Sequence, residues 1–268
     1  MLKLNGPFMD LARHRSLVHE LTKREIVGRY RGANFGLLWA LISPFLMLAV
    51  YTLAFGGILG SHWPTQDGKI HSFALILFVG LIIHAFLAEC INQSPQLVAG
   101  NPSYVKKVVF PLEILPWPLV TSALFHLAMN VVAYAVLALA MDQYLPWTIV
   151  LLPLAVLPLV ILGLGVSWGL AALGVYFRDI TQITGVASTA LLFTSTAIIP
   201  VSAIPDNMRW LFMANPLSFI IDQARNVAVW GKMPDWQGLA IYALVALLVS
   251  YLGYGVFRAT RRGFADVL

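Results

Sequence analysis

The stretch FGLLWALISPFLMLAVYTLAFGGILG, residues 35–60, contains no charged side chain. A helix that crosses the hydrocarbon core of a bilayer needs about 20 apolar residues, so this stretch is long enough to span a membrane. The whole chain has the same character: of its 268 residues, 59% are hydrophobic and 11% are charged, with a mean hydropathy of +0.81. Soluble domains have about 25% charged residues, so the composition predicts a membrane protein.

Five further apolar segments predict five more membrane-spanning helices. They are residues 72–95, 115–141, 147–177, 180–199 and 237–257. The first of these is interrupted by four polar side chains, namely His84, Glu89, Asn92 and Gln93. We therefore expect an all-α membrane protein with six transmembrane helices in a single domain, residues 1–268. An even number of spans places both termini on the same side of the membrane.

The distribution of lysine and arginine predicts which side that is. With the N-terminus inside, thirteen of the 17 cations lie in inner segments: Lys3, Arg13, Arg15, Lys23, Arg24, Arg29, Arg31, Lys106, Lys107, Arg178, Arg258, Arg261 and Arg262. The outer segments carry Lys69, Arg209, Arg225 and Lys232. Cytoplasmic segments are enriched in such residues, so both termini are expected in the cytoplasm. The net charge of +5 then reflects membrane orientation, and nucleic-acid binding is excluded.

Residues 8–31 are basic and do not form a span. Apolar residues recur there at roughly helical spacing, separated by Arg13, Arg15, Lys23 and Arg24. This pattern predicts an amphipathic helix that lies at the inner interface, with its cations near anionic head groups. The alternative is a plain basic flank of the first span, without a further role.

Residues 200–231, between the last two spans, predict a re-entrant helical hairpin. Asp206 or Asn207 is suited to cap a short helix, MRWLFMA, which Asn215-Pro216 ends. The next segment, LSFIIDQARNVAVW, would be about 21 Å long as a helix. That is too short for a hydrocarbon core of about 30 Å, and the segment is too apolar for water. Such backbone is tolerated in a membrane only where protein or a water-filled cavity covers it.

The inner loop GNPSYVKKVVFPLEILP, residues 100–116, predicts a short helix over 101–109. Asn101 is suited to its cap and Pro102 to its first position, and Pro111 prevents its continuation. One face would carry Tyr104, Val105, Val108 and Val109, while Lys106 and Lys107 point elsewhere. A helix this short is unstable alone in water, so it needs a surface to pack on. The alternative is a basic loop whose lysines reach the head groups.

Two patterns raise other functions. Residues 165–169 match G-x-S-x-G, so Ser167 with His84 or His126 could form an intramembrane serine protease. However, the motif lies within an apolar run, where Gly165 and Gly169 favour close helix packing instead. His84, Glu89, His126 and Asn130 are polar residues in or near spans. Such residues are functional candidates, and a proton relay through Glu89 and His84 in a secondary transporter is the second alternative.

Residues on two spans are candidates for lining a channel. Thr181, Thr184, Ser188 and Ser195 lie close to one face of the span 180–199. Their hydroxyls either contact a polar solute or bond to backbone carbonyls and neighbouring helices. Trp39, Tyr51 and Phe55 in the first span either stack on sugar rings or pack within the protein. The chain has no G-x-x-x-x-G-K-[ST] motif, so it has no P-loop for ATP, and no metal-ligand cluster is evident.

Three segments carry a resemblance to a known family. REIVGRYRGANFGLLWALISPFLMLAVYTLAFG (24–56), NPSYVKKVVFPLEILP (101–116) and YFRDI (176–180) resemble the membrane subunit of ABC-2-type exporters of O-antigen, capsule or teichoic-acid polysaccharides, with O-antigen export the most similar. The resemblance covers nearly the whole chain. It implies the ABC-2 (type V) exporter fold and a permease, not an enzyme, in the bacterial inner membrane.

The resemblance also implies partners and site residues. The permease would be a homodimer around a channel for a lipid-linked polysaccharide, bound to two copies of a separate P-loop ATPase. ATP and Mg²⁺ would bind to that ATPase, and this chain would hold no cofactor. Motion would enter through the interface helix and through Asn101, Pro102, Tyr104, Val105, Lys106, Lys107, Val108, Arg178 and Asp179. The hairpin would act as an outer gate, with Trp210, Phe212, Asn215 and Pro216.

Overall fold

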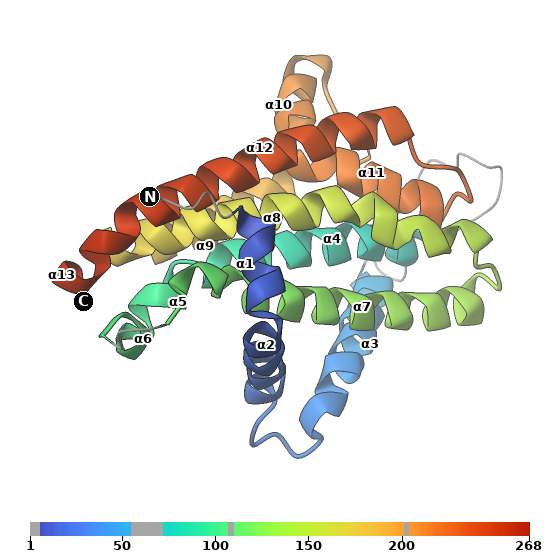
Figure 1. The fold of residues 1–268 in the computed structure, drawn as a ribbon. Helices are drawn as coiled ribbons and strands as arrows, with labels where there is room; N and C mark the ends of the chain where they lie inside the picture. Colours follow the sequence, from blue (N-terminus) through green and yellow to red (C-terminus); the bar gives the residue numbers. More distant parts are fainter. Residues whose placement is uncertain (1–5, 55–71, 107–109, 201–203) are drawn as a thin grey trace.

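The computed structural model describes residues 6–54, 72–106, 110–200 and 204–268, and all regular structure in these ranges is helical (Figure 1). This confirms the prediction of an all-α fold. The α-helices are α1 (Pro7–Arg13), α2 (Arg15–Arg29), α3 (Trp39–Tyr51), α4 (Phe73–Gln93), α5 (Gln96–Ala99), α6 (Pro102–Lys106), α7 (Pro116–Met141), α8 (Leu152–Tyr176), α9 (Ile180–Phe193), α10 (Arg209–Ala214), α11 (Pro216–Ala228), α12 (Trp236–Thr260) and α13 (Phe264–Val267).

Short 3₁₀ turns extend several of these helices. They are η1 (Gly36–Leu38), η3 (Leu112–Ile114), η4 (Trp147–Leu151), η6 (Asp206–Met208) and η7 (Arg261–Gly263). Within the described residues, five helical stretches are long and apolar enough to cross a membrane: Gly36–Ala54, Phe73–Gln93, Leu112–Met141, Trp147–Tyr176 and Trp236–Val267. The chain is therefore a multi-pass membrane protein.

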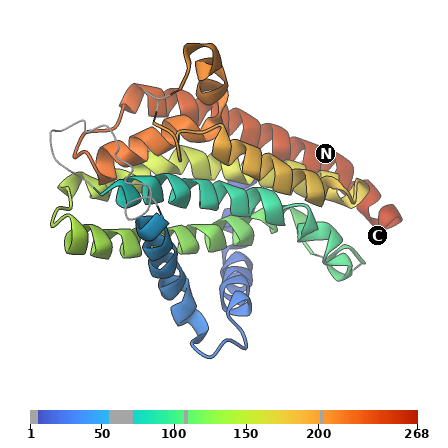
Figure 2. The ribbon, with the colours of Figure 1, turned by 180° about the vertical axis from the view of Figure 1, so that it is seen from behind.

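The helix α4 lies at the centre of the bundle. It runs beside α7 and α8, with α9 and α11 along its other side (Figures 1 and 2). Its buried side chains surround the helix, among them Leu75, Ile83 and Phe86. A helix that is apolar all round is stable only when other helices or lipid cover every face, and here four helices cover it.

The helices α8 and α12 cross at very close range. A Cβ atom added to Gly253 would lie 2.0 Å from the carbonyl oxygen of Gly165, and one added to Gly165 would lie 2.6 Å from the backbone of Ser250. Small residues permit this approach of two backbones. Gly169, which the sequence paired with Gly165, has open space around it, so only Gly165 serves the crossing.

The expected span over 180–199 differs from the structure, because α9 ends at Phe193 and is 14 residues long. At about 1.5 Å per residue, it is too short to cross the hydrocarbon core alone. Buried side chains donate hydrogen bonds to backbone carbonyls in the last turn of α9 and just after it. Arg225 donates to the carbonyls of Thr196 and Ala197 over 2.6 Å and 2.8 Å, and Asn215 donates to that of Leu191 over 2.8 Å.

The hairpin segment forms η6, α10 and α11. The side chain of Asn215 accepts a hydrogen bond from the backbone N–H of Leu217 over 2.8 Å, and Pro216 occupies the first turn, so α11 begins there. Gly231, with φ of +65°, turns the chain after α11. The helix α11 lies along α4 and α8, whereas α10 stands out from the bundle (Figure 1).

The basic N-terminal segment, expected as one helix over 8–31, is two helices joined at His14. The helix α2 runs across the direction of the bundle (Figure 1). Val18 and Leu21 of α2 are buried with Ile114 in a small apolar cluster of their own.

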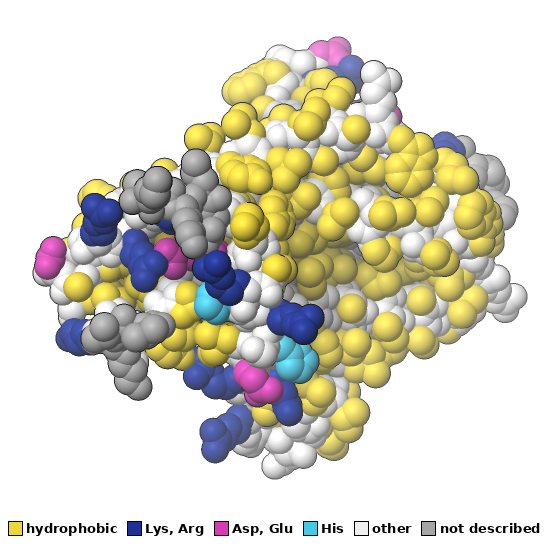
Figure 3. Space-filling model, viewed as in Figure 1, with side chains coloured by type: hydrophobic (Ala, Val, Ile, Leu, Met, Phe, Trp, Pro, Cys, Tyr) yellow, Lys and Arg dark blue, Asp and Glu magenta, His cyan; other side chains and the backbone are white. Residues whose placement is uncertain are grey.

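The elements that the sequence predicts on the inner side gather at one end of the bundle. The helices α5, α6 and α13 lie there with the α8–α9 junction (Figures 1 and 2). Lysine and arginine side chains gather toward the same end, over the N-terminal and C-terminal helices, while hydrophobic side chains dominate the rest of the visible face (Figure 3). The described basic segments are thus separated from the apolar bundle, as the sequence predicted.

Candidate functional site

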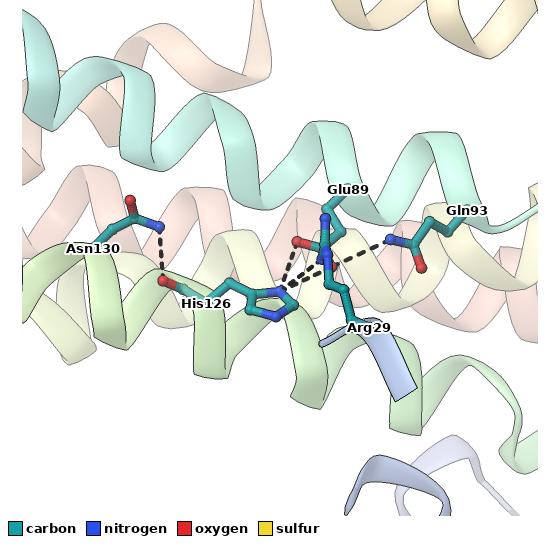
Figure 4. Close-up of polar contacts among 5 residues, drawn as sticks. All are labelled: Arg29, Glu89, Gln93, His126 and Asn130. Atoms are coloured by element: carbon teal, nitrogen blue, oxygen red, sulfur yellow. Dashed lines mark hydrogen bonds and ion pairs between the residues drawn. The ribbon is translucent and has the colours of Figure 1, made fainter. Parts of the chain in front are cut away.

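A polar cluster joins α2, α4 and α7 near the inner end (Figure 4). Nη1 of Arg29, at the end of α2, lies 2.5 Å from Oε1 of Glu89 in α4. Nδ1 of His126 in α7 lies 3.0 Å and 3.1 Å from the two oxygens of the same carboxylate. The side chains of Glu89 and His126 are each 12% exposed, against 48% for Arg29. One carboxylate therefore connects the interface helix to two helices of the bundle.

Further contacts fix the orientation of this cluster. Gln93 donates to Oε1 of Glu89 over 3.3 Å, and Asn130 donates to the carbonyl of His126 over 2.7 Å (Figure 4). The ring of Tyr30 meets that of His126 edge-on, and burial raises the pKa of the Tyr30 phenol. Nδ1 of His126 also lies 3.0 Å from Nη1 of Arg29. Nε2 of His126 is buried and has no hydrogen-bond partner among the described residues.

A cavity of about 430 Å³ opens beside the cluster, between α3, α4 and α7. Trp39 and Tyr51 of α3 form part of its wall, and Glu89, His126 and Asn130 supply polar groups. Aromatic faces with carboxylate and amide groups are suited to a polar organic ligand such as a sugar. The sequence named Trp39 and Tyr51 as candidate channel residues, and the structure places both at this cavity. Phe55, the third, lies outside the described residues.

A second cavity, of about 360 Å³, lies on the other side of the ion pair. Its wall includes Arg24, Gln93 and Ser122. Arg29 and Glu89 belong to both cavities. The ion pair therefore stands between a pocket next to α2 and the pocket bounded by α3.

The interface helix also contacts the short inner helix α6. Nη2 of Arg24 donates to the hydroxyl of Tyr104 over 2.5 Å. The ring of Tyr104 stacks on that of Phe110, with centroids 4.4 Å apart, and Phe110 packs against the Val18–Leu21 cluster. The surface that the sequence required for this helix is thus, in part, α2 of the same chain.

The other predicted coupling residues lie around α6 and the α8–α9 junction. Pro102 begins α6, while the side chain of Asn101 donates back to the carbonyl of Leu97 over 3.2 Å. Val105 is partly buried and Lys106 is exposed. Arg178 and Asp179 are exposed between α8 and α9, near the hydrogen bond from Gln96 to Thr181. Lys107 and Val108 lie outside the described residues.

Comparison with known proteins identifies the family. The ABC-2 type transporter family matches residues 16–229, which is most of the chain. The chain belongs to this family.

Three curated relatives of this family member match nearly their whole length. The O-antigen export system permease protein RfbA of Myxococcus xanthus is 28% identical over 96% of this chain and 97% of its own. The protein of the same name from Klebsiella pneumoniae is 22% identical over 92% and 93%. The polysialic acid transport protein KpsM of Escherichia coli is 22% identical over 90% and 92%. The family is one of transporter membrane subunits rather than of enzymes.

The predicted hydroxyl stripe of this ABC-2 family member faces α4. Thr184, Ser188 and Ser195 are buried, and each donates to the backbone carbonyl three residues before it. Ser188 also donates to Asn92 of α4 over 3.1 Å. Ser188 thus joins α9 to α4, and none of the three buried residues lines an open surface of the chain. Thr181 accepts a hydrogen bond from Gln96 of α5.

The two alternative chemistries lack the geometry that they need. Ser167 lies inside the continuous helix α8, and its Oγ is buried without a hydrogen-bond partner in the described residues. It thus has no strand-to-helix turn and no histidine to activate it. Nε2 of His84 lies 2.9 Å from the carbonyl of Ser188, and the described contacts do not connect His84 to Glu89.

The predicted outer gate residues divide into two groups. Trp210 of α10 is 68% exposed, whereas Phe212 and Asn215 are buried. Asn215 and Pro216 start α11, so their role in this family member is to fix the hairpin. Trp210 and the neighbouring Met213, 84% exposed, present an apolar tip outside the bundle.

The sequence analysis assigned no structural role to Arg29 or Arg225, although both connect separate helices in the structure. It counted Arg29 only as an inner cation and Arg225 only as an outer one. Arg225 is 3% exposed and also donates to the carbonyl of Ile76 over 3.1 Å. One signal was available: Arg29 follows an amphipathic helix and Arg225 interrupts an apolar segment, and a charge in apolar surroundings requires partners.

Proposed function

We propose that this chain is the membrane permease subunit of an ATP-driven exporter that moves a lipid-linked polysaccharide across the bacterial inner membrane. The carrying observation is the match to O-antigen export permeases over nearly the full length of both chains. O-antigen is the proposed substrate class because the relative with 28% identity carries that name. The aromatic and polar cavity at Trp39 and Tyr51 supports a sugar polymer as the transported molecule.

We propose a homodimer as the working unit. In one chain, α3 exposes Leu46, Met47, Val50 and Leu53, and α9 exposes Ile183, Val186 and Phe193. The helix α3 of one chain forms only one side of the cavity at Trp39, and α4 and α7 form the other sides. A second copy facing these surfaces would enclose a channel between the two chains.

ATP and Mg²⁺ bind, in this proposal, to two copies of a separate ATPase subunit on the cytoplasmic side. The family membership supports such a partner. The inner end carries α6, the exposed Arg178–Asp179 pair and both described chain ends (Figures 1 and 2). The helix α6 and the Arg178–Asp179 pair form the docking surface, and both termini are cytoplasmic.

The polar cluster transmits motion from that surface. A shift of α6 moves α2 through Arg24 and Tyr104, and α2 carries Arg29, which holds Glu89. Displacing Arg29 separates α2 from α4 and α7 and joins the two cavities that the ion pair divides. In this proposal the hairpin of α10 and α11 restricts the outer mouth of the channel.

Export in a strain that lacks the native permease tests this function. Expression of this chain with its ATPase should restore surface polysaccharide, detected by immunoblot of outer-membrane fractions. An ATPase with an inactive P-loop lysine should abolish export. Export that persists with the inactive ATPase would rule out an ATP-driven permease and favour the proton-coupled alternative.

A charge swap tests the role of Arg29 and Glu89. Arg29→Glu alone should reduce export at least tenfold, because it places two carboxylates together in a poorly solvated site. Arg29→Glu combined with Glu89→Arg should recover a substantial part of export, since the ion pair is restored in reverse. A proton relay needs a carboxylate at position 89 and predicts an inactive double variant. Glu20→Gln, an exposed change on the same helix away from both cavities, is the control.

A further inference from the structure

A further cavity lies away from the polar cluster. It has a volume of about 1090 Å³ and lies between the start of α1 and the last turns of α12. Phe8, Tyr251 and Tyr254 form aromatic walls, and Arg258, Arg261 and Arg262 line the inner end. Neither the family resemblance nor the proposed function assigns a role to it.

Among the described residues, two of the three arginines have no carboxylate partner. Nη1 of Arg261 is paired with the carboxylate of Glu113, and the hydroxyl of Tyr254 donates to the carboxylate of Asp10. Arg258 lies over the ring of Tyr254, 5.7 Å from its centroid. Within the described residues no carboxylate pairs with Arg258 or Arg262. The cavity therefore presents two guanidinium groups to a negatively charged ligand.

The same face of α12 continues from the cavity as an apolar strip. Leu244, Leu248 and Tyr251 lie at helical spacing along this face and are 68%, 61% and 53% exposed. Arg258 and Arg262 follow at the same spacing. In a span of a membrane protein, an exposed apolar face contacts acyl chains, so its basic end lies at the depth of the head groups. A soluble partner cannot reach along this strip.

Gly255 lies on α12 between the apolar strip and the arginines, and its lack of a side chain leaves space in the cavity. It lines the cavity, and a Cβ atom added there would meet no atom within 4 Å. Any other residue at this position would narrow the passage between Tyr251 and Arg258. The gap thus connects an apolar surface to a pair of cations.

We propose that this cavity binds the head group of an anionic phospholipid. The phosphate accepts hydrogen bonds from Arg258 and Arg262, because guanidinium groups match phosphate oxygens in geometry and charge. The acyl chains lie on the α12 strip. The bound lipid joins α1 to α12 at the inner surface and holds the start of the interface helix at membrane depth.

Native mass spectrometry of the full-length chain in detergent, with phosphatidylglycerol added, tests this site. Wild-type protein should retain the lipid, and phosphatidylcholine at the same concentration should not compete. The double variant Arg258→Gln/Arg262→Gln should bind about 25-fold more weakly, at about fivefold per arginine. Gly255→Leu should weaken binding comparably, since it fills the cavity and leaves both charges in place.

The control removes the same charge elsewhere. Arg209→Gln/Lys232→Gln loses two exposed cations at the opposite end and should bind phosphatidylglycerol as wild type does. Equal binding by wild type, Gly255→Leu and the Arg258/Arg262 variant would overturn the proposal. Displacement of the lipid by equimolar inorganic phosphate would overturn it in favour of a free-anion site. Loss of ATPase co-purification with unchanged lipid binding would instead assign these arginines to a protein contact.

Discussion

A single buried side chain, Arg225, determines how the outer half of the bundle is built. Its guanidinium donates to carbonyls of α4 and of the segment after α9. Gly80 of α4 makes room for this contact, because a Cβ atom there would lie 2.8 Å from both Nη2 of Arg225 and Cα of Ala197. Non-helical backbone is stable at membrane depth only with such internal donors.

Replacing Arg225 by Met should therefore destabilise the protein by several kcal/mol, since each buried acceptor left without a donor costs about 1–3 kcal/mol. The chain has one cysteine, Cys90, and it is fully buried. A thiol-reactive dye thus reports unfolding directly, and the Arg225→Met variant should react at a clearly lower temperature. Arg225→Lys should fall between it and wild type. A Met variant with the wild-type melting temperature would show that the carbonyls have other donors.

At the scale of helices, packing depends on where small residues meet. The sequence contains the pair Gly165 and Gly169, and either one was equally eligible for a close crossing. The structure selects Gly165, because Ser250 and Gly253 of α12 lie opposite it. Local composition determines whether a segment forms a helix. Which glycine lies against another helix depends instead on how the helices pack in the folded protein.

The substitution Gly253→Ala should destabilise the crossing, because its Cβ would lie 2.0 Å from the carbonyl oxygen of Gly165. Overpacking of this kind costs about 1–3 kcal/mol. Gly169→Ala is the matched control, since it has open space and gains about 1 kcal/mol of helix propensity. In the Cys90 thiol assay the first should lower the melting temperature and the second should not. Equal melting temperatures would mean that α8 and α12 separate without cost.

For the whole molecule, the layout follows from charge and hydropathy. The long helices could be predicted from the apolar segments, and their common inner end from the positions of the lysines and arginines. Hydropathy and charge are local properties of the chain, so the sequence alone reveals them. The break at His14, the short α9 and the Glu89 cluster depend on contacts between residues far apart in sequence. Arg29 and Glu89 are 60 residues apart in the sequence, and no local pattern reveals their pairing.

The proposed outer gate makes a prediction at this scale. Deletion of residues 206–214 keeps Asn215 and Pro216, and so preserves the cap of α11 while removing α10. Proteoliposomes with this variant should be more permeable to small solutes than those with wild type, in a fluorescent-dye efflux assay. Lys232→Gln, in the neighbouring loop, should leave permeability unchanged. Equal permeability of the deletion variant and wild type would refute a gating role for α10.

The dependence of α9 on later residues has a consequence for biosynthesis. The chain emerges from the ribosome with its N-terminus first, so α9 reaches the membrane before Asn215 and Arg225 have been made. Its 14 residues are too few to settle across the bilayer as an independent segment. The helices α9, α10 and α11 must therefore enter the membrane as one unit, after translation has passed Arg225. A nascent chain stopped at Pro200 would leave α9 at the surface, accessible to protease.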